Sequence, residues 1–227
     1  MTTPRNRPAS NDLLGEARVI VERVAAQAGL PSPAVELAPT VDRPGAPKAN
    51  AHYQVIRGVP TIKITEAALR ELPSDVLESL VTHELGHLAD ETWWKQKRRQ
   101  YLAGLSFAAL LLFAGLIAAA TADTSDADMT PGGVTMGCGA IVASAAYLIF
   151  RANSRTSELR ADRFAARQHG NVSSAQALFA VWDREAPEPT QHRRLRLLFR
   201  SHPYQATRLT AIEAEITRQD PPATRRT

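Results

Sequence analysis

The sequence has few of the residues that cross-link a protein or direct its export. Cys138 is the only cysteine among 227 residues, so no disulfide can form within the chain and nothing requires an oxidising compartment. The first twelve residues, MTTPRNRPASND, are polar and contain no apolar core. We therefore expect no signal peptide.

A pattern typical of nucleic-acid binding is also lacking, although the chain is basic, with a formal charge of +4 and a pI of about 9.6. Much of the positive charge lies in residues 95–99 and 193–200. Neither cluster alternates with aromatic residues in a known binding pattern. We expect no nucleic-acid partner.

The chemically informative stretch is HELGH at residues 83–87, which has the pattern H-E-x-x-H. On a helix, residues four apart lie on one face, so His83 and His87 can bind the same metal ion. Glu84 then lies where its carboxylate can reach a water on that metal. Zinc lowers the pKa of such a water and polarises a carbonyl, while a nearby carboxylate transfers the proton. The motif predicts one Zn²⁺ per chain and peptide-bond hydrolysis.

A motif this short also occurs by chance, and the alternative is a helix with two structural histidines and a surface glutamate. The surrounding sequence favours a helix, which Ser74 would cap after Pro73. Apolar residues recur there at helical spacing: Leu77, Leu80, Val81, Leu85 and Leu88.

Two uncharged runs follow, at residues 101–122 and 134–150. The first has 22 residues, enough to cross a bilayer core of about 30 Å at about 1.5 Å per residue. The second has only 17, but its small side chains allow close packing on the first. We predict a transmembrane helical hairpin over residues 101–150. The alternative is a buried hairpin in a soluble domain.

The flanks of this hairpin are basic, whereas its inner loop is acidic. The flanking residues are Lys95, Lys97, Arg98, Arg99, Arg151 and Arg155, and the loop contains Asp123, Asp126 and Asp128. The positive-inside rule then places both flanks and the H-E-x-x-H motif in the cytoplasm. We expect a multi-pass protein of the cell (inner) membrane, in contact with the lipid bilayer.

Strand-like segments precede the motif, at residues 53–57 and 61–65, and a short strand is expected at 34–38. Pro60 favours an edge position for the second segment. An extended peptide substrate could add to such an edge through main-chain hydrogen bonds. The residues concerned are Thr61, Ile62, Lys63 and Ile64. The alternative is a plain hairpin that binds no ligand.

A catalytic zinc requires three protein ligands and an open position for water. The metzincin pattern places a third histidine at position 93, where this chain has Trp93, and there is no cysteine pair. The remaining candidate for the third ligand is a carboxylate from a later helix. Residues 157–168 predict such a helix, beginning at Ser157, with Ala161 and Ala165 forming a small-residue face that another helix can approach.

Glu158 on this helix is the candidate ligand. It lies 71 residues after His87, but the hairpin accounts for 50 of them and leaves 21, since a membrane hairpin that returns to the same side is almost closed. Asp162, on the same face, could accept a hydrogen bond from the outer nitrogen of a ligand histidine and fix its tautomer. The alternative is a solvated helix face, since arginines alternate with these carboxylates.

The order HELGH, hairpin, SELRADRFAA and SHPYQATRL resembles the HtpX-like family of membrane zinc peptidases, relatives of the CAAX prenyl proteases, over residues 12–218. The resemblance implies that His83, His87 and Glu158 are the zinc ligands. It also implies that Glu84 is the general base, and it matches Asp162 to the aspartate of the family's E-x-x-x-D helix.

Further matches lie on both sides of the motif. His202, Pro203 and Arg208 correspond to a late H-P…R motif, in which the histidine helps to stabilise the oxyanion and the arginine helps to hold the site. Asn50 and Ala51 resemble the Asn-Ala pair before the family's edge strand. The resemblance implies a catalytic role for His202 and a substrate-strand role for Asn50 and Ala51.

Together these patterns predict a mainly α (α+β) fold, with a zincin-like catalytic domain, a small β-hairpin or edge strand and an inserted transmembrane hairpin. The catalytic domain would comprise residues 11–100 and 151–218. Residues 1–10 and 219–227 would be disordered.

The expected function is a membrane-anchored zinc endopeptidase that acts on protein or peptide substrates. The resemblance implies damaged or misfolded membrane and cytoplasmic proteins as substrates. The alternative is a membrane-tethered adaptor that binds zinc but does not cleave.

Overall fold

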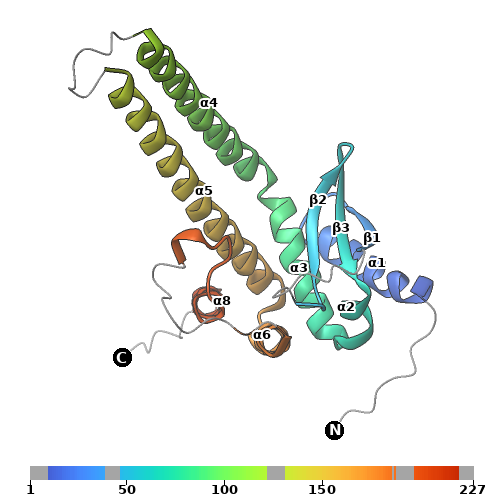
Figure 1. Ribbon diagram of the computed structural model, residues 1–227. Helices are drawn as coiled ribbons and strands as arrows, with labels where there is room; N and C mark the ends of the chain where they lie inside the picture. Colours follow the sequence, from blue (N-terminus) through green and yellow to red (C-terminus); the bar gives the residue numbers. More distant parts are fainter. Residues whose placement is uncertain (1–9, 39–46, 122–130, 186, 188–196, 220–227) are drawn as a thin grey trace, which may run out of the picture. The chain divides into compact units, whose positions relative to one another are not determined.

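The computed structural model describes residues 10–38, 47–121, 131–185, 187 and 197–219. The predicted disordered ends fall outside these ranges, except that Ser10 and Gln219 are helical. Figure 1 shows the elements, which are α1 (Ser10–Gln27), β1 (Ala34–Ala38), β2 (Ala51–Ile56), β3 (Val59–Thr65), α2 (Glu66–Glu71), α3 (Ser74–Ala89), α4 (Glu91–Thr121), α5 (Pro131–His169), α6 (Ser173–Glu185) and α8 (Gln205–Gln219). This mainly helical chain with a small sheet confirms the predicted α+β class.

The chain divides into two compact units. The first, which we call the motif unit, comprises Met1–Asp90, Ser157–Gln191 and Pro203–Thr227. The second, the hairpin unit, comprises Glu91–Thr156 and His192–His202. The boundaries therefore differ from the predicted ones, because α4 begins ten residues before the apolar run. Helix α5 also belongs to both units.

The sheet of the motif unit has the order β1-β3-β2, with β1 parallel and β2 antiparallel to β3. Strand β3 is therefore central, and the prediction that residues 61–64 form an edge is wrong. The signal from Pro60 misled because this residue lies just before β1 pairing begins, at Ala34 opposite Thr61. Its missing N–H removes no hydrogen bond to β1. The edge strand that lies next to α3 is β2.

Helices α1 and α3 bury their apolar stripes with the sheet in one core. The predicted stripe of α3 is confirmed: Leu77, Leu80, Val81, Leu85 and Leu88 are all buried. Ile62 and Ile64 of β3 are wholly buried beside them. Each such side chain contributes about 1.5–3 kcal/mol when it leaves water. Ser74 does not cap α3: its hydroxyl donates to Glu16 of α1 over 2.8 Å instead.

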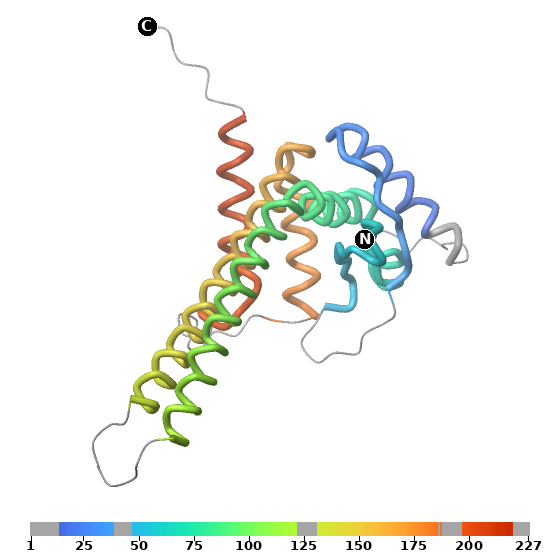
Figure 2. Tube along the Cα trace, turned by 90° about the horizontal axis from the view of Figure 1, so that it is seen from above, coloured from blue at the N-terminus to red at the C-terminus, as the bar shows by residue number. Residues whose placement is uncertain are grey.

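The hairpin unit contains two helices, α4 and α5, that lie side by side in both views (Figures 1 and 2). Both are long and apolar enough to cross a membrane, and only 11% and 6% of their most apolar segments are buried. Among the described residues the apolar surface is thus mostly exposed, which contradicts the alternative of a buried hairpin. The close packing predicted for the small residues of 134–150 is confirmed at Gly139, where a Cβ would lie 2.9 Å from Leu112 Cγ.

Helix α5 continues without a break from the second apolar run into the segment that carries Glu158. The predicted helix start at Ser157 is therefore wrong. No glycine or proline occurs between Gly139 and Gly170, so nothing in the backbone interrupts the helix. Ser157 is an interior residue of α5, which leaves its hydroxyl available for another contact.

Candidate metal centre

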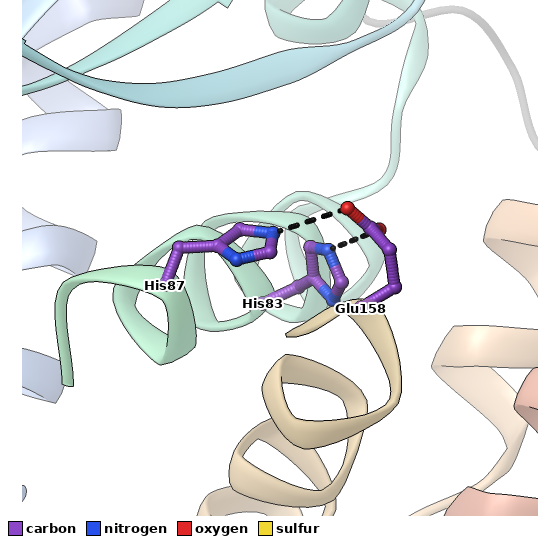
Figure 3. A group of neighbouring side chains, drawn as sticks. All are labelled: His83, His87 and Glu158. Carbon is purple, nitrogen blue, oxygen red and sulfur yellow. Dashed lines mark ion pairs between the residues drawn. The ribbon is translucent and has the colours of Figure 1, made fainter. Parts of the chain in front are cut away.

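Three side chains from two helices converge in the motif unit. His83 and His87 project from the same face of α3, and Glu158 reaches them from α5 (Figure 3). His83 Nε2 lies 3.4 Å from Glu158 Oε2, and His87 Nε2 lies 3.6 Å from Glu158 Oε1. One ligand atom from each of the three lies within 4.8 Å of the others. Among the described residues, this is the group that could hold a metal ion.

The approach of α5 to α3 depends on a glycine of the motif. A Cβ on Gly86 would lie 2.7 Å from Ala161 Cα, which is closer than side-chain carbons approach a backbone. The predicted small-residue face around Ala161 is thus confirmed as a helix contact. At the end of α3, Arg160 of α5 forms an ion pair with Asp90, with an Nη2 to Oδ1 distance of 2.7 Å. These contacts place Glu158 opposite the two histidines.

The outer nitrogens of both histidines have partners. His83 Nδ1 lies 2.9 Å from Asp162 Oδ1, as the sequence predicts for this aspartate. His87 Nδ1 lies 3.3 Å from Ser157 Oγ. A hydrogen on Nδ1 of each ring leaves Nε2, the nitrogen nearest Glu158, as the atom that a metal ion can bind. The sequence carries no signal for this contact of Ser157, because the pattern around it predicts the start of a helix.

Asp162 is in turn fixed by Arg208 of α8. The guanidinium donates from Nε to Oδ2 over 2.8 Å and from Nη2 to Oδ1 over 2.7 Å, a bidentate pair. Arg208 is 5% exposed, and its guanidinium lies 4.7 Å from the ring of Phe179 and 5.4 Å from that of Trp182. Arg208 is therefore held by an ion pair with Asp162 and by contacts with two aromatic rings, which fits its predicted role in holding the site.

Glu84 is buried, and its carboxylate points towards the sheet. Its Oε2 accepts a hydrogen bond from the backbone N–H of Tyr53 in β2 over 2.6 Å. Burial raises the pKa of Glu84 to about 7, while the nearby charge of His83 and the N–H of Tyr53 act in the opposite direction. No side-chain pattern reveals a backbone donor, so the sequence contained no signal for the Tyr53 contact.

The two histidines differ in their pKa values. Burial lowers the pKa of His83, but contacts with Asp162 and Glu158 outweigh this effect and raise the pKa to about 10. Burial and the charge of His83 lower the pKa of His87 to about 4. The pair therefore favours one positive charge, which is placed between two carboxylates.

Both carboxylates are ionised at neutral pH. Burial alone would raise the pKa of Glu158, but the charge and hydrogen bond of His83 bring it well below its usual range. Arg208 and His83 similarly lower the pKa of Asp162 to about 2 against the effect of burial. Arg208 and the positive charge of the histidines balance the two carboxylates, and Glu158 is the carboxylate that lies at the Nε2 atoms.

The residues present fit a catalytic zinc ion. Two imidazole nitrogens and one carboxylate oxygen form the His₂Glu donor set of known catalytic zinc sites, and three protein ligands leave a coordination position for water. The partners of the outer histidine nitrogens complete the pattern, because such contacts orient the rings and raise ligand basicity.

The residues predicted to bind substrate do not all lie at an edge of the sheet. Thr61, Ile62, Lys63 and Ile64 lie in the central strand β3, which has a neighbouring strand on both sides and cannot accept another one. Asn50 precedes β2 and its Oδ1 accepts the N–H of Ala51 over 2.9 Å. Ala51 is the first residue of β2, whose outer edge carries the contact to Glu84. The edge available near the site therefore belongs to β2.

His202 belongs to the hairpin unit, whereas the other site residues belong to the motif unit. Its Nδ1 lies 2.8 Å from the hydroxyl oxygen of Ser201. The role of His202 in oxyanion stabilisation stays a prediction.

Comparison with known proteins gives consistent matches. The sequence matches Peptidase family M48 over residues 14–216. The protease HtpX homolog of Pyrococcus furiosus is 31% identical over 183 residues, which cover 77% of this chain and 59% of the relative. That of Pyrococcus abyssi is 33% identical with the same coverage, and protease HtpX homolog 1 of Streptomyces coelicolor is 30% identical over 203 residues, or 82% of this chain and 60% of the relative. The chain thus spans about three-fifths of the length of these relatives.

A solved structure has the same fold. The crystal structure of S. mikatae Ste24p matches with a TM-score of 0.61 and 16% sequence identity, covering 93% of this chain and 51% of that one. At this identity the likeness concerns the fold alone, and it agrees with the zincin-like arrangement predicted from the sequence.

Proposed function

Because this chain belongs to peptidase family M48, we propose that it is a zinc-dependent endopeptidase anchored in a membrane. The observation that carries the proposal is the convergence of His83, His87 and Glu158, with Glu84 next to the first ligand. A zinc ion held by these ligands would supply a Lewis acid for the scissile carbonyl and for the attacking water. The remaining chemistry is a proton transfer that the protein itself must provide.

Glu84 is the group for that transfer. Its carboxylate accepts the proton of the attacking water and then donates it to the leaving amine. The Tyr53 N–H holds one carboxylate oxygen, which orients the group for both steps. Asp162 and Ser157 hold the histidine rings, so that the two Nε2 atoms stay directed at a common point.

The substrate strand is proposed to add to β2 rather than to β3. The β2 edge lies beside the general base, and an extended peptide that pairs there would have its main chain close to Glu84. Ala51 begins this strand and Asn50 immediately precedes it, so their predicted role fits the corrected edge. On the resemblance to HtpX-like proteases, the substrates proposed are damaged or misfolded membrane and cytoplasmic proteins.

Helices α4 and α5 are proposed to cross the bilayer as a hairpin. Their exposed apolar surface supports this proposal, and by the positive-inside rule the basic flanks favour a cytoplasmic location of the motif unit. A chain anchored in this way would meet membrane-bound substrates at the surface of the bilayer.

Zinc content and cleavage of casein, measured on detergent-purified protein, test the proposal. Wild type and Glu84→Gln should each bind one zinc per chain, and only wild type should cleave. Glu71→Gln, on the exposed surface of α2, is the matched control and should behave as wild type. Removal of zinc with a chelator should abolish cleavage, and added zinc should restore it.

Two results would contradict the proposal. Zinc in both proteins with cleavage in neither would favour a zinc-binding adaptor. Absence of zinc in the wild type would favour structural histidines.

A further inference from the structure

A short helical turn at residues 197–199 lies against α5 in the hairpin unit (Figure 1). Arg151 of α5 donates from Nε to the carbonyl oxygen of Phe199 over 2.6 Å, and its Nη2 contacts the same oxygen. Arg155, one turn further along α5, donates from Nη1 to the carbonyl oxygens of Leu197 at 2.8 Å and Arg200 at 3.0 Å. Two guanidinium groups thus fix the backbone of the segment.

These contacts satisfy carbonyls that a turn leaves without intrahelical partners, and they place positive charge at its C-terminal end. Two apolar side chains of the turn stay largely open to the surroundings. Leu198 remains 44% exposed and Phe199 52% exposed. The turn therefore presents apolar side chains outward while its polar backbone is bonded to α5.

The turn lies at the boundary between the charged and uncharged parts of α5. Arg151 is the first charged residue after the run 134–150. The ring of Phe199 lies 6.4 Å from that of Tyr147, one helical turn to the uncharged side of Arg151. Phe199 therefore borders the surface proposed to face lipid.

Other aromatic side chains gather at this level of the hairpin unit. Phe150 stacks on Tyr101 at 4.4 Å and contacts Trp94 at 5.5 Å. Tyr101 begins the apolar run of α4, so the same boundary is marked on both helices. Aromatic rings concentrate at membrane–water interfaces in this way, where the apolar face of the ring meets lipid and its polar edge meets water.

We propose that residues 197–200 form an interfacial anchor, in which Leu198 and Phe199 enter the boundary between lipid headgroups and acyl chains. The occupant of this surface is the bilayer, because Phe199 contacts Tyr147 of α5, and the neighbouring α5 residues Leu148 and Ile149 are also exposed. The inference rests on the proposed membrane anchoring by α4 and α5. It adds a third contact with lipid, placed two residues before His202 in the chain.

Site-directed spin labelling of the full chain in nanodiscs tests the anchor. Cys138 is the only native cysteine, so Cys138→Ser provides a clean background. Nitroxides are attached at Leu198→Cys or Phe199→Cys, and collisions with oxygen are compared with collisions with a water-soluble Ni(II) complex. Leu110→Cys, at a 66% exposed position of α4, serves as the lipid-facing reference, and Glu213→Cys, on the exposed face of α8, as the water-facing reference.

The oxygen-to-nickel collision ratio at positions 198 and 199 should be severalfold higher than at 213 and approach that at 110. A ratio equal to that at 213, with 110 in lipid, overturns the anchor and leaves the proposed hairpin intact. Water-like ratios at all four positions overturn both proposals.

A second variant tests how the segment is held. Arg151→Gln should lower the collision ratio at 199 and raise the mobility of its label, because the backbone tether is lost. Arg184→Gln, on the exposed surface of α6, should leave both unchanged. An unchanged label in Arg151→Gln would overturn the tethering role of this arginine.

Discussion

The backbone N–H of Tyr53 donates a hydrogen bond to Oε2 of Glu84 over 2.6 Å. This contact joins the exposed edge of the sheet to the proposed general base. A substrate strand that pairs with β2 would therefore be positioned by the same element whose backbone orients Glu84. The donor is the backbone of Tyr53, so a test of this contact must remove the N–H and not only the side chain.

Tyr53→Pro removes the N–H and is expected to reduce kcat about 10- to 100-fold, since a hydrogen bond to a charged group contributes about 1.5–3 kcal/mol. Zinc content should be unchanged, because the N–H that is removed bonds Glu84, which is not one of the three proposed zinc ligands. Tyr53→Ala keeps the N–H and separates the backbone effect from loss of the ring. Equal kcat values in the two variants, measured on one peptide substrate, would show that the N–H does not orient Glu84.

Ser157→Ala should weaken zinc binding about tenfold, near the low end of the effect of losing an outer partner of a ligand histidine. The contact from Ser157 Oγ to His87 Nδ1 is 3.3 Å, which is long enough to make the effect modest. Thr156→Ala is the matched control, because the Thr156 hydroxyl donates only to Ala152 of its own helix. Competition with a fluorescent chelator measures both affinities, and equal values would exclude a role for Ser157.

The local features of the site could be predicted from sequence, because helical spacing alone puts His83 and His87 on one face. Glu158 could be predicted because a hairpin returns the chain to its starting point, which brings a distant residue near. The order of the strands could not. The alternation of Ile62 and Ile64 indicates a strand, but its central position depends on pairing with β1 (Ala34–Ala38), whose residues lie 27 positions before their partners in β3.

Contacts made by backbone groups were also beyond sequence reasoning. The Tyr53 N–H has no residue-type signature, and any residue except proline would supply it. Serine is common at helix starts, so the sequence predicts one at Ser157, whereas its interior position depends on the continuous helix α5.

Gly86→Ala is expected to destabilise the protein by about 1–3 kcal/mol and to lower zinc affinity, because the added Cβ would lie 2.7 Å from Ala161 Cα. The helices would have to separate, and Glu158 would move away from the histidines. Gly15→Ala is the matched control: the glycine lies in α1, nothing lies within 4 Å of its added Cβ, and alanine favours a helix. Chemical denaturation should show loss of stability in the first variant and a small gain in the second. Similar behaviour of both would contradict the close contact of α3 with α5.

Trp182 contacts both Arg208, which holds Asp162, and Ala49, which lies just before β2, so it tests whether the metal centre and the substrate edge are linked. Its Nε1 donates to the carbonyl oxygen of Ala49 over 2.8 Å, just before β2, and its ring lies 5.4 Å from the guanidinium of Arg208. Trp182→Phe keeps a ring beside Arg208 but removes the donor. Because a neutral hydrogen bond contributes about 0.5–1.5 kcal/mol, KM should rise about 2- to 10-fold while zinc affinity stays constant.

Trp182→Leu removes the ring as well as the donor, so it should raise KM and also weaken zinc binding through looser support of Arg208. Peptide kinetics and chelator competition on the two variants separate these effects. If Trp182→Phe instead lost zinc with an unchanged KM, the bond to Ala49 would have no part in substrate binding. The edge strand would then depend for its position on the sheet alone.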